Sequence, residues 1–536
     1  MGFTDELCNW AADLTYDDIP ESTRQAVKLQ IMSVLAAVRW GARSSKITKL
    51  ARAVMRGYGN ATGVGEANNN RDTLGSSLST LSDGPVSSAV LGHSTSLWDA
   101  IYLDTAASVV HDFDDYLFAG HTGHSAVIVS LRVAELCSKE GQPVDGKSFL
   151  TAVVAANEAG GRLGASMLFG PHNGQMWSYI HLLSAAIAAS KLLGLDSKAT
   201  ESAVGLAFSQ PNYPLVATFM GSDAKALIAS QPSVDGTKGA FLAASGLEGA
   251  PGILEDRSGF WAAFKKDALR QMFSGFGRAW VSESLSYKIY PGCAYLDTAQ
   301  DALFEIAAEY RKSTGGPLAA EDIESVRVEA GMLTSGMETM SGWYRKDRLR
   351  PTNMNFSVAL TGALSIIAGR LSPDLFEPAY LEPMHDRIVE LAQKFSIVHS
   401  PELTAQMSPR KEDPKAFDLR RVLSKKQGAL DDVDFSTYES RFPAVVTMRL
   451  KSGKSFTARQ DIPLGGAGRP REETCRLVRR KLAEAFASSP GAAEAIGRFI
   501  ENLEGSEDAA ELASLSIRVE DGTQEVTTLR PLGDTE

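Results

Sequence analysis

Residues 109–124, with the sequence VVHDFDDYLFAGHTGH, gather a high density of proton-transfer side chains into one short segment. The segment holds three aspartates, three histidines and a tyrosine. Imidazole exchanges protons readily near neutral pH, and a neighbouring carboxylate orients it and raises its basicity. The order Asp112, Tyr116, His121 across a glycine-containing loop therefore predicts a general acid/base site, with His124 as a second histidine beside it.

Two other interpretations fit the same segment. The aspartates are suited to cap helices, and the histidines are suited to the surface of a loop. The spacing of His121 and His124 beside carboxylates also suits zinc or iron. However, the segment lacks the HExxH pattern and supplies no evident third ligand, so we expect no bound metal.

Two lysines offer positive charge to set against these acids. Lys225, in FMGSDAKALIAS, follows a Gly-Ser turn close to an expected helix start. Lys288, in SYKIYPGCAY, precedes a Tyr-Pro-Gly turn where we expect a domain boundary. A lysine at such a junction is well placed to face a cleft, and helix N-termini add partial positive charge there. Taken singly, each lysine also fits a solvated position on the surface.

The composition is that of an ordinary globular protein, with 44% hydrophobic and 22% charged residues. A formal net charge of −11 argues against a nucleic-acid partner, because phosphate binding needs a basic face. The four cysteines are far apart and form no CxxC pair, which favours a reducing compartment. The sequence has neither a secretory signal nor a run of about 18 apolar residues, so we expect a cytoplasmic protein without a membrane span.

The pattern up to about residue 275 is mostly helical. Apolar residues at three- and four-residue spacing predict a helix over 18–42, and the apolar stretch 178–196 predicts a helix buried among others. Past about residue 285, short β-branched runs occur at 323–331, 394–400 and 444–463. The last run contains Ser-Gly between two alternating segments, which is typical of a hairpin.

These patterns predict a mostly α fold made of a large all-helical domain and a smaller α+β domain. A chain of 536 residues is too long for one simple core. We place the first part of the helical domain at residues 1–284 and the α+β domain at residues 285–464. Residues 465–536 are helical again and are expected to pack back on the helical domain, ending in an extended arm.

Six segments of the chain follow one another in a recognisable order. They are SSAVLGHSTSLWDAIYLDTAASVVHDFDD, ASKLLGLD, KGAFLAASGLEGAPGILEDRSGF, KIYPGC, NFSVALTGAL and RLKSGKSFTARQDIPLGGAGRP. In this order the chain resembles the MmgE/PrpD family, which includes 2-methylcitrate dehydratase, cis-aconitate decarboxylase and iminodisuccinate epimerase. The resemblance implies that the α+β domain is a lid over an active site, that the protein is a homodimer, and that it works without a metal or cofactor.

The resemblance also implies catalytic roles for single residues. Asp112 matches the first aspartate of the family motif, Tyr116 the hydroxyl position after it, and His121 the histidine that closes the loop. Lys225 matches the lysine after the Gly-rich turn. Lys288 matches the lysine before Tyr-Pro.

Three positions depart from the family pattern. Gln175 stands where the family has a second histidine, and His172 lies three residues earlier. Asp297 replaces a histidine that often follows KIYPGC, and Leu360 replaces a tyrosine common in decarboxylase-like members. Gln175 keeps hydrogen-bonding capacity but cannot shuttle a proton. The residues expected to contact the substrate are His124 (the alternate to His121), His172, Gln175, Tyr290 and Asp297.

The family's reactions share the removal or addition of a proton at a carbon next to a carboxylate. The resulting carbanion is a dianionic enolate, which lysine ammonium groups stabilise in a partly dry cleft. We expect His121, oriented by Asp112, to move the proton, and Tyr116 to protonate a leaving hydroxide.

The sequence therefore predicts a cofactor-independent lyase that dehydrates a citrate-like or alkyl-citrate-like polycarboxylate. Two alternatives stay open. One is decarboxylation or epimerisation of a cis-aconitate-like acid in the same scaffold. The other is a binding protein that keeps a carboxylate pocket without catalysis, which the missing family histidines support. The retained Asp112, His121, Lys225 and Lys288 speak against the binding protein.

Overall fold

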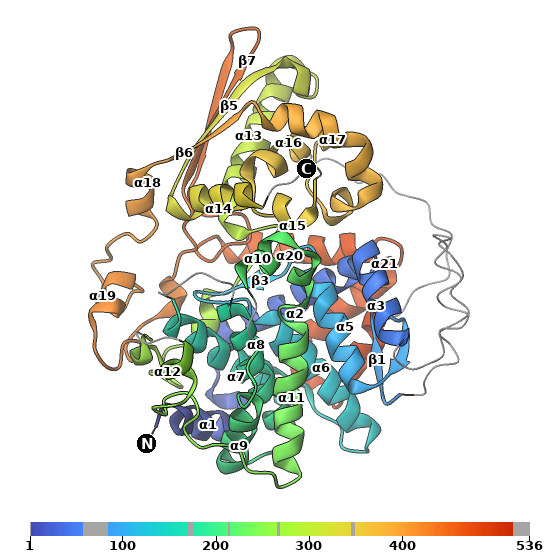
Figure 1. Cartoon of the computed structure of the whole chain (residues 1–536), viewed down its shortest axis with the longest axis vertical. Helices are drawn as coiled ribbons and strands as arrows, with labels where there is room; N and C mark the ends of the chain where they lie inside the picture. Colours follow the sequence, from blue (N-terminus) through green and yellow to red (C-terminus); the bar gives the residue numbers. More distant parts are fainter. Residues whose placement is uncertain are drawn as a thin grey trace.

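The chain folds into a large helical body and a smaller α+β lid stacked on one end of it (Figure 1). The computed structural model describes residues 2–56, 84–168, 175–212, 215–264, 268–344 and 349–517, with the backbone alone for residues 175–177 and Val216. The predicted fold class, mostly α with a helical domain and an α+β domain, is confirmed.

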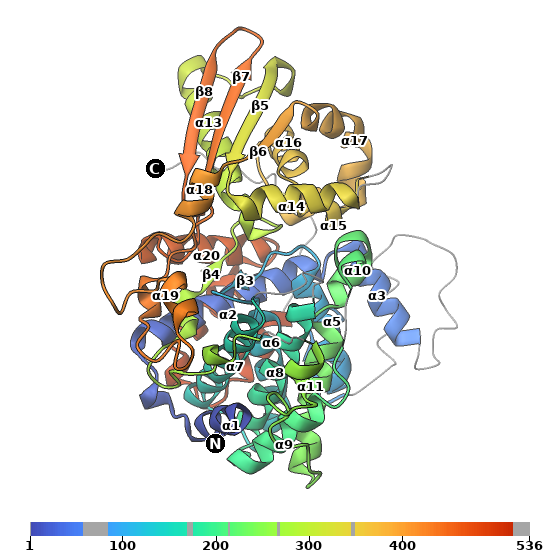
Figure 2. The same ribbon diagram turned by 60° about the vertical axis from the view of Figure 1, so that its left-hand side comes forward.

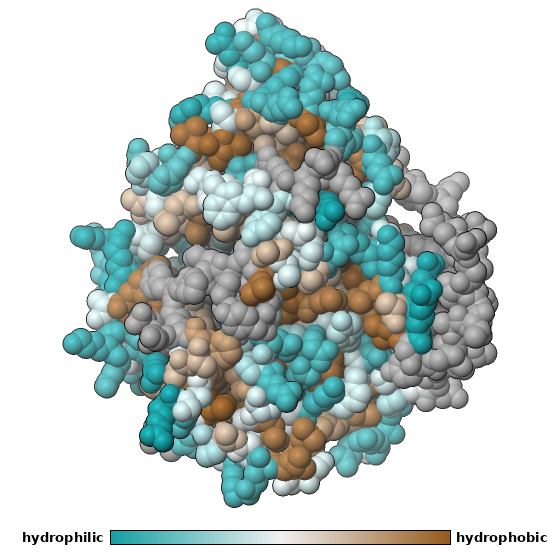
Figure 3. Space-filling model, viewed as in Figure 1, coloured by the Kyte–Doolittle hydropathy of each residue, from teal (hydrophilic) through white to brown (hydrophobic). Residues whose placement is uncertain are grey.

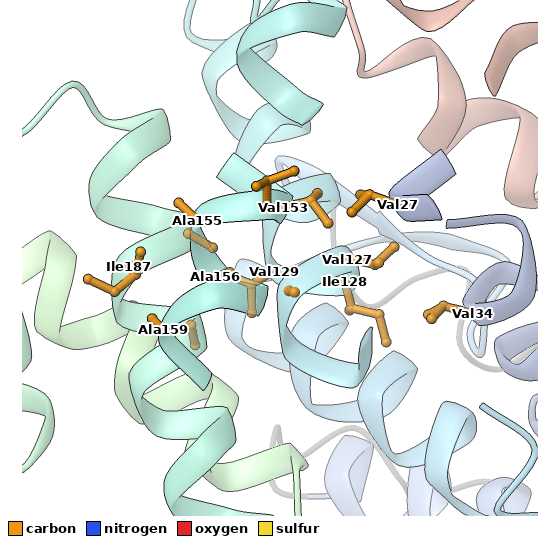
Figure 4. Packing of buried hydrophobic residues seen from close by; sticks show 14 of the residues in the cluster. Val27, Val34, Val127, Ile128, Val129, Val153, Ala155, Ala156, Ala159 and Ile187 are labelled. Atoms are coloured by element: carbon orange, nitrogen blue, oxygen red, sulfur yellow. The ribbon is translucent and has the colours of Figure 1, made fainter. Parts of the chain in front are cut away.

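Six helices form the centre of the body, with small and branched apolar side chains packed between them. They are α2 (Glu21–Gly41), α5 (Leu97–Val109), α6 (Gly123–Lys139), α7 (Gly146–Ser166), α8 (Gln175–Leu192) and α11 (Ser230–Ala244). Valine, isoleucine and alanine side chains fill the layer between α2, α6, α7 and α8 (Figure 4). A Cβ at Gly164 would lie 1.7 Å from the carbonyl oxygen of Ala119, so only glycine permits this approach. The helices expected over 18–42 and 178–196 are confirmed.

Shorter elements surround these helices. They are α1 (Phe3–Asp13), α3 (Ser45–Arg56), α9 (Ser197–Ala207), α10 (Val216–Gly221), α12 (Phe260–Phe264) and the antiparallel pair β1 (Val86–Ser88) and β2 (His93–Thr95). Near the C-terminus, α20 (Arg471–Ala485), α21 (Pro490–Glu501) and α22 (Glu511–Ile517) return to the body, where Val478, Leu482 and Leu512 join its hydrophobic core. The predicted return of the C-terminal segment is therefore observed. The arm expected at its end lies outside the described residues.

The lid is a four-stranded sheet covered by helices (Figure 2). Its strands are β5 (Ile323–Ala330), β6 (Phe395–His399), β7 (Ala444–Leu450) and β8 (Ser455–Gln460), in the order β6-β5-β7-β8. β5 pairs with β6 in parallel and with β7 antiparallel, and β7 and β8 form the predicted hairpin. The lid helices are α13 (Asp297–Thr314), α14 (Met332–Trp343), α15 (Pro351–Met354), α16 (Val358–Ala368), α17 (Pro378–Ala392) and α18 (Pro401–Gln406).

Part of the segment predicted as α+β domain belongs to the body. The short helix α19 (Leu419–Ser424) and its flanks cross back to the body, and Phe417, Leu430 and Phe435 are buried in the body's core. The range 285–464 is therefore too broad for the lid. The sequence could not reveal this, because an apolar residue shows that it will be buried but not in which of two cores.

The surface of the lid differs between its tip and its base. On the face in Figure 3, hydrophilic side chains dominate the tip, where the turn between β7 and β8 lies. Strand β7 alternates buried and more exposed residues, as expected for a sheet with one covered face.

Among the described residues, no helix combines the length and the apolar composition that crossing a bilayer requires.

Candidate active site

A short backbone pairing joins the two chemically rich segments of the sequence. Strand β3 (Asp115–Tyr116) pairs antiparallel with β4 (Ser286–Tyr287). Beyond this pair, the N–H of Lys288 donates to the carbonyl of Asp114 at 3.1 Å, and the N–H of Gly292 donates to the carbonyl of Asp112 at 3.0 Å. The aspartate-rich segment is therefore held against the segment that carries Lys288.

Asp112 binds both of the predicted lysines. Its Oδ1 lies 2.5 Å from Nζ of Lys288, and its Oδ2 lies 2.8 Å from Nζ of Lys225. Asp112 has φ of 52°, the one non-glycine residue of the described chain in the left-handed region. Aspartate tolerates that region better than most residues, and such backbone strain is concentrated at functional sites.

These contacts shift the ionisation of all three groups. Burial alone would raise the pKa of Asp112, but the ammonium groups of Lys225 and Lys288 outweigh it and lower the pKa to about 2. Burial also opposes the charge on Lys288, yet Asp112 and Asp114 raise its pKa. For Lys225 burial prevails, and its pKa is lowered despite Asp112. Asp112 and Lys288 are thus a firm ion pair, and Lys225 is the more easily neutralised cation.

Lys225 stands where the body meets the lid. It lies in the short 3₁₀ helix η2 (Asp223–Leu227), whose N-terminus is capped by Ser222. The lysine Nζ is 4.8 Å from the ring centre of Phe356 in the lid and 5.8 Å from that of Phe219. Phe356 belongs to the hydrophobic cluster of the lid, and Phe219 on α10 packs against that cluster. Lys225, for which the sequence indicated only a position near a helix start, therefore lies at the junction of body and lid.

Asp114, and not Asp112, orients the histidines. Its Oδ2 lies 2.7 Å from Nδ1 of His121 and 2.9 Å from Nε2 of His124, and its Oδ1 lies 3.0 Å from Nζ of Lys288. The predicted pairing of His121 with Asp112 is therefore wrong. The Asp112 carboxylate is paired with both lysines, and the Asp114 carboxylate, two residues later, binds the two imidazoles instead.

The charge on Asp114 fixes the proton positions on His121. Burial would raise the pKa of Asp114, but Lys288, His124 and His121 together hold it well below its ordinary value. An ionised carboxylate only accepts hydrogen bonds, so we assign the proton of His121 to Nδ1. In the neutral imidazole, Nε2 is then the ring nitrogen that can accept a proton. His121 keeps 21% of its side chain exposed, whereas Asp114 is fully buried.

Other groups complete the surroundings of the histidines. Ser108 Oγ lies 2.7 Å from Nδ1 of His124, and His181 packs edge-on against His124 with its Nδ1 3.0 Å from Ser125 Oγ. Burial holds the pKa of His181 well below its ordinary value, so this imidazole is neutral. Sequence reasoning gave no role to Asp114, Ser108 or His181. The clustering of six histidines between residues 93 and 181 was the available signal.

Tyr116 lies beside His121, with ring centres 6.1 Å apart. Its hydroxyl accepts a hydrogen bond from Ser440 Oγ at 2.8 Å. Burial raises the pKa of Tyr116, so the phenol keeps its proton at neutral pH. The hydroxyl therefore retains a hydrogen to donate, which is what protonating a leaving oxygen requires.

The residues expected to contact substrate are not all near this cluster. His172 lies outside the described residues. Gln175 is the first residue of α8, and the structure describes its backbone alone. Tyr290 packs in the core of the lid, and its hydroxyl donates to Asp301 at 2.9 Å. Leu360 is also buried in that core. Among the expected substrate-binding residues whose side chains are described, His124 pairs with Asp114, and Asp297 interacts electrostatically with Lys288 and Asp112.

Asp297 begins α13 and is 3% exposed. Burial raises its pKa well above the ordinary value, and the nearby Asp301 adds to this effect while Lys288 opposes it. Burial therefore favours the protonated form of Asp297, which can donate a hydrogen bond where the family resemblance implies a histidine.

The trio Asp114, His121 and His124 is the group of described residues that could hold a metal ion, with one ligand atom from each within 4.8 Å of the others. Both imidazoles already hydrogen-bond to the Asp114 carboxylate. The ammonium of Lys288, 3.0 Å from that carboxylate, opposes a second positive charge beside it. The arrangement suits proton transfer better than metal binding.

Asp115, next to this cluster, gives a prediction about stability. Its Oδ2 accepts a hydrogen bond from Gln30 at 2.7 Å, and burial and Asp114 raise its pKa to about 6. A carboxyl whose folded pKa is raised loses stabilisation as the pH rises through that value. Asp115→Asn removes this penalty, so the free energy of unfolding at pH 8 should rise by about 1–3 kcal/mol. Urea titrations should show the gain at pH 8 and its disappearance near pH 4.

Comparison with known proteins agrees with this architecture. The model of the MmgE/PrpD N-terminal domain matches residues 5–271, and that of the MmgE/PrpD C-terminal domain matches residues 290–437. The chain belongs to the MmgE/PrpD family. Lys288 lies in the link between the two matched regions of this MmgE/PrpD protein, and residues 438–536 follow both.

Curated relatives of this MmgE/PrpD chain are similar over most of their length. A cis-aconitate decarboxylase-like protein of Aspergillus oryzae is 27% identical over 423 residues, which is 74% of this chain and 80% of the relative. A cis-aconitate decarboxylase of Aspergillus terreus is 24% identical over 481 residues, or 87% of this chain and 86% of the relative.

Proposed function

We propose that this MmgE/PrpD protein is a cofactor-independent lyase that dehydrates a citrate-like or alkyl-citrate-like polycarboxylate. The observation that carries the proposal is the ion cluster of Asp112, Asp114, Lys225 and Lys288 beside His121. Proton abstraction at a carbon next to a carboxylate needs a base and nearby positive charge. Here Asp114 holds the base, His121, and Asp112 holds the two ammonium groups of Lys225 and Lys288.

Lys225 is the group best suited to bind the substrate. Its Nζ has three N–H donors, and among the described residues the Asp112 carboxylate alone lies within ion-pair distance. Aromatic rings, which accept hydrogen bonds only weakly, flank the rest of the ammonium. A substrate carboxylate would supply further acceptors and favour the charged form of Lys225.

The proposed steps use side chains of this chain alone. Nε2 of His121 takes the proton from the carbon next to the substrate carboxylate, and Asp114 stabilises the imidazolium that forms. Lys225 stabilises the negative charge that develops on the carboxylate oxygens. Tyr116 gives its hydroxyl proton to the leaving hydroxide, so that water departs and an alkene remains.

A second candidate is decarboxylation of a cis-aconitate-like acid. It is favoured by the curated relatives, which are named as cis-aconitate decarboxylase and as a decarboxylase-like protein. Loss of carbon dioxide leaves the same kind of carbanion, which then receives a proton instead of losing a hydroxide. Asp297, whose pKa burial raises, is in its protonated form a second proton donor suited to that step.

The two reactions differ in what they release. We expect purified protein incubated with 2-methylcitrate or citrate in deuterated water to form an alkene, detected by ultraviolet absorbance and mass spectrometry. Release of carbon dioxide from cis-aconitate would favour decarboxylation instead. Deuterium in recovered substrate without net conversion would favour an epimerase. No reaction and no binding with any of these acids would remove the proposal.

Two further expectations rest on the family resemblance and the sequence. We propose a homodimer, which sedimentation of the purified protein would test, and a cytoplasmic location. The partner that we propose is the small polycarboxylate itself.

A further inference from the structure

Lys481 is a buried lysine that contacts the backbone of the candidate active site. It lies on α20, beyond both regions that the family models match, and it is 2% exposed. Buried lysines are rare unless their ammonium groups are fully paired.

The ammonium of Lys481 binds the backbone of both site segments. Its Nζ donates to the carbonyl oxygens of Phe113 at 2.6 Å and Lys288 at 3.0 Å, and it lies 3.4 Å from that of Asp114. Ser33 Oγ on α2 accepts a fourth contact at 2.9 Å. The ammonium also lies 3.9 Å from the ring centre of Phe113.

These carbonyls belong to the peptide units next to the charged side chains of the site. The peptide carbonyls of Phe113 and Asp114 flank the Asp114 side chain, and the carbonyl of Lys288 belongs to the residue whose ammonium binds Asp112 and Asp114. One side chain thus contacts three peptide carbonyls from two segments that are more than 170 residues apart in sequence. Burial lowers the pKa of Lys481 to about 7, although Asp114 and Asp115 oppose this shift. In its protonated form the side chain has three N–H donors for these carbonyls, and a charged donor makes stronger hydrogen bonds than a neutral one.

We propose that Lys481 is a positioning residue that sets the separation of the Asp114 carboxylate from the Lys288 ammonium. It touches no reacting atom in this account and acts through Asp114, which holds His121. Its kinetic consequence rests on the proposed function, whereas the ordering of the two segments does not. The two parts can therefore be tested separately.

The chain offers a matched control in Lys28. That lysine is 5% exposed, and it also joins α2 to the C-terminal segment, donating to the carbonyl of Glu501 at 2.9 Å and pairing with Glu504. Among the described residues, Lys28 makes no hydrogen bond or ion pair with either site segment. Replacing each lysine with methionine removes a similarly buried ammonium, but only Lys481→Met should disturb the site.

The first experiment measures amide hydrogen exchange by mass spectrometry. In Lys481→Met we expect exchange to quicken by about tenfold or more in peptides covering 111–118 and 285–293. Lys28→Met should leave these two peptides at the wild-type rate. Equal exchange in the two variants at these peptides would overturn the proposal, whether or not the protein turns over any acid tested.

The second experiment measures turnover. We expect kcat of Lys481→Met to fall by roughly 10²-fold with KM little changed, because misplacement of catalytic groups by about 1 Å costs that much. Lys28→Met should keep the wild-type kcat. If Lys481→Met does not fold, Ser33→Ala removes one of the four acceptors and should show smaller changes of the same kind. Wild-type exchange and wild-type kcat in Ser33→Ala would then contradict the proposal.

Discussion

Lys225→Met should lower kcat/KM for the polycarboxylate substrate by about 10³-fold or more while the chain stays folded. Removing a single neutral donor from a preorganised anion-binding site costs about 10²–10³-fold, and Lys225 contributes a full charge. The fold should survive because Asp112 keeps its pairing with Lys288 at 2.5 Å. Initial rates with the substrate identified in deuterated water, together with a thermal melt, would check both parts.

Lys46 provides the control for this variant. It lies on α3 and pairs with Asp223 in η2, the same short helix that carries Lys225, at 2.7 Å. Its side chain is 20% exposed, and partly exposed ion pairs contribute little. We expect Lys46→Met to keep kcat/KM within about twofold of wild type. A Lys225→Met protein with wild-type rates would remove this lysine from the proposed site.

Asp114→Asn is the second change with a large expected effect. Asparagine has the same shape, but it offers one oxygen and no charge to the two imidazoles and the ammonium that the carboxylate now binds. We expect kcat to fall by about 10²–10⁴-fold, since His121 loses both its orientation and the charge that stabilises its protonated form. The free energy of unfolding should fall by roughly 3 kcal/mol.

The pH dependence of that stability loss follows from the direction of the pKa shift. The pKa of Asp114 in the folded chain lies well below its ordinary value, chiefly because Lys288 and the two histidines outweigh burial. The ionised Asp114 carboxylate therefore adds to the free energy of unfolding at pH values above its pKa in the unfolded chain. This stabilisation is lost as the pH falls through its pKa in the folded chain. Denaturant titrations of wild type and Asp114→Asn should differ most at neutral pH and converge in strong acid. The matched control is Asp115→Asn, which should keep kcat.

The ion cluster is viable because its charges nearly cancel. Two lysines face two aspartates in a region where isolated charges would be costly, and each carboxylate has at least two cationic or hydrogen-bonding partners. Such a cluster contributes less to stability than to placing its members. Asp112 and His121 are the members with partly exposed side chains, at 13% and 21%.

Local sequence patterns were sufficient for the main elements. The three- and four-residue spacing of apolar residues predicted the body helices, and the alternating pattern of 444–463 predicted the β7–β8 hairpin. The density of acids and histidines at 109–124, with the two lysines, indicated the groups that meet in the cluster. These features depend on neighbouring residues, so the sequence alone determined them.

The partners within the cluster depend on contacts between distant residues. Asp112 and Asp114 are the same residue type two positions apart, and nothing in the local pattern tells which one binds the lysines and which one binds the histidines. Three tertiary features determine which aspartate binds which partner. They are the left-handed backbone at Asp112, the pairing register of β3 with β4, and the contacts of Lys481 with three backbone carbonyls. The assignment of 416–435 to the body has a similar origin. Only the tertiary structure could decide these points, because each depends on pairing energies between segments far apart in the chain.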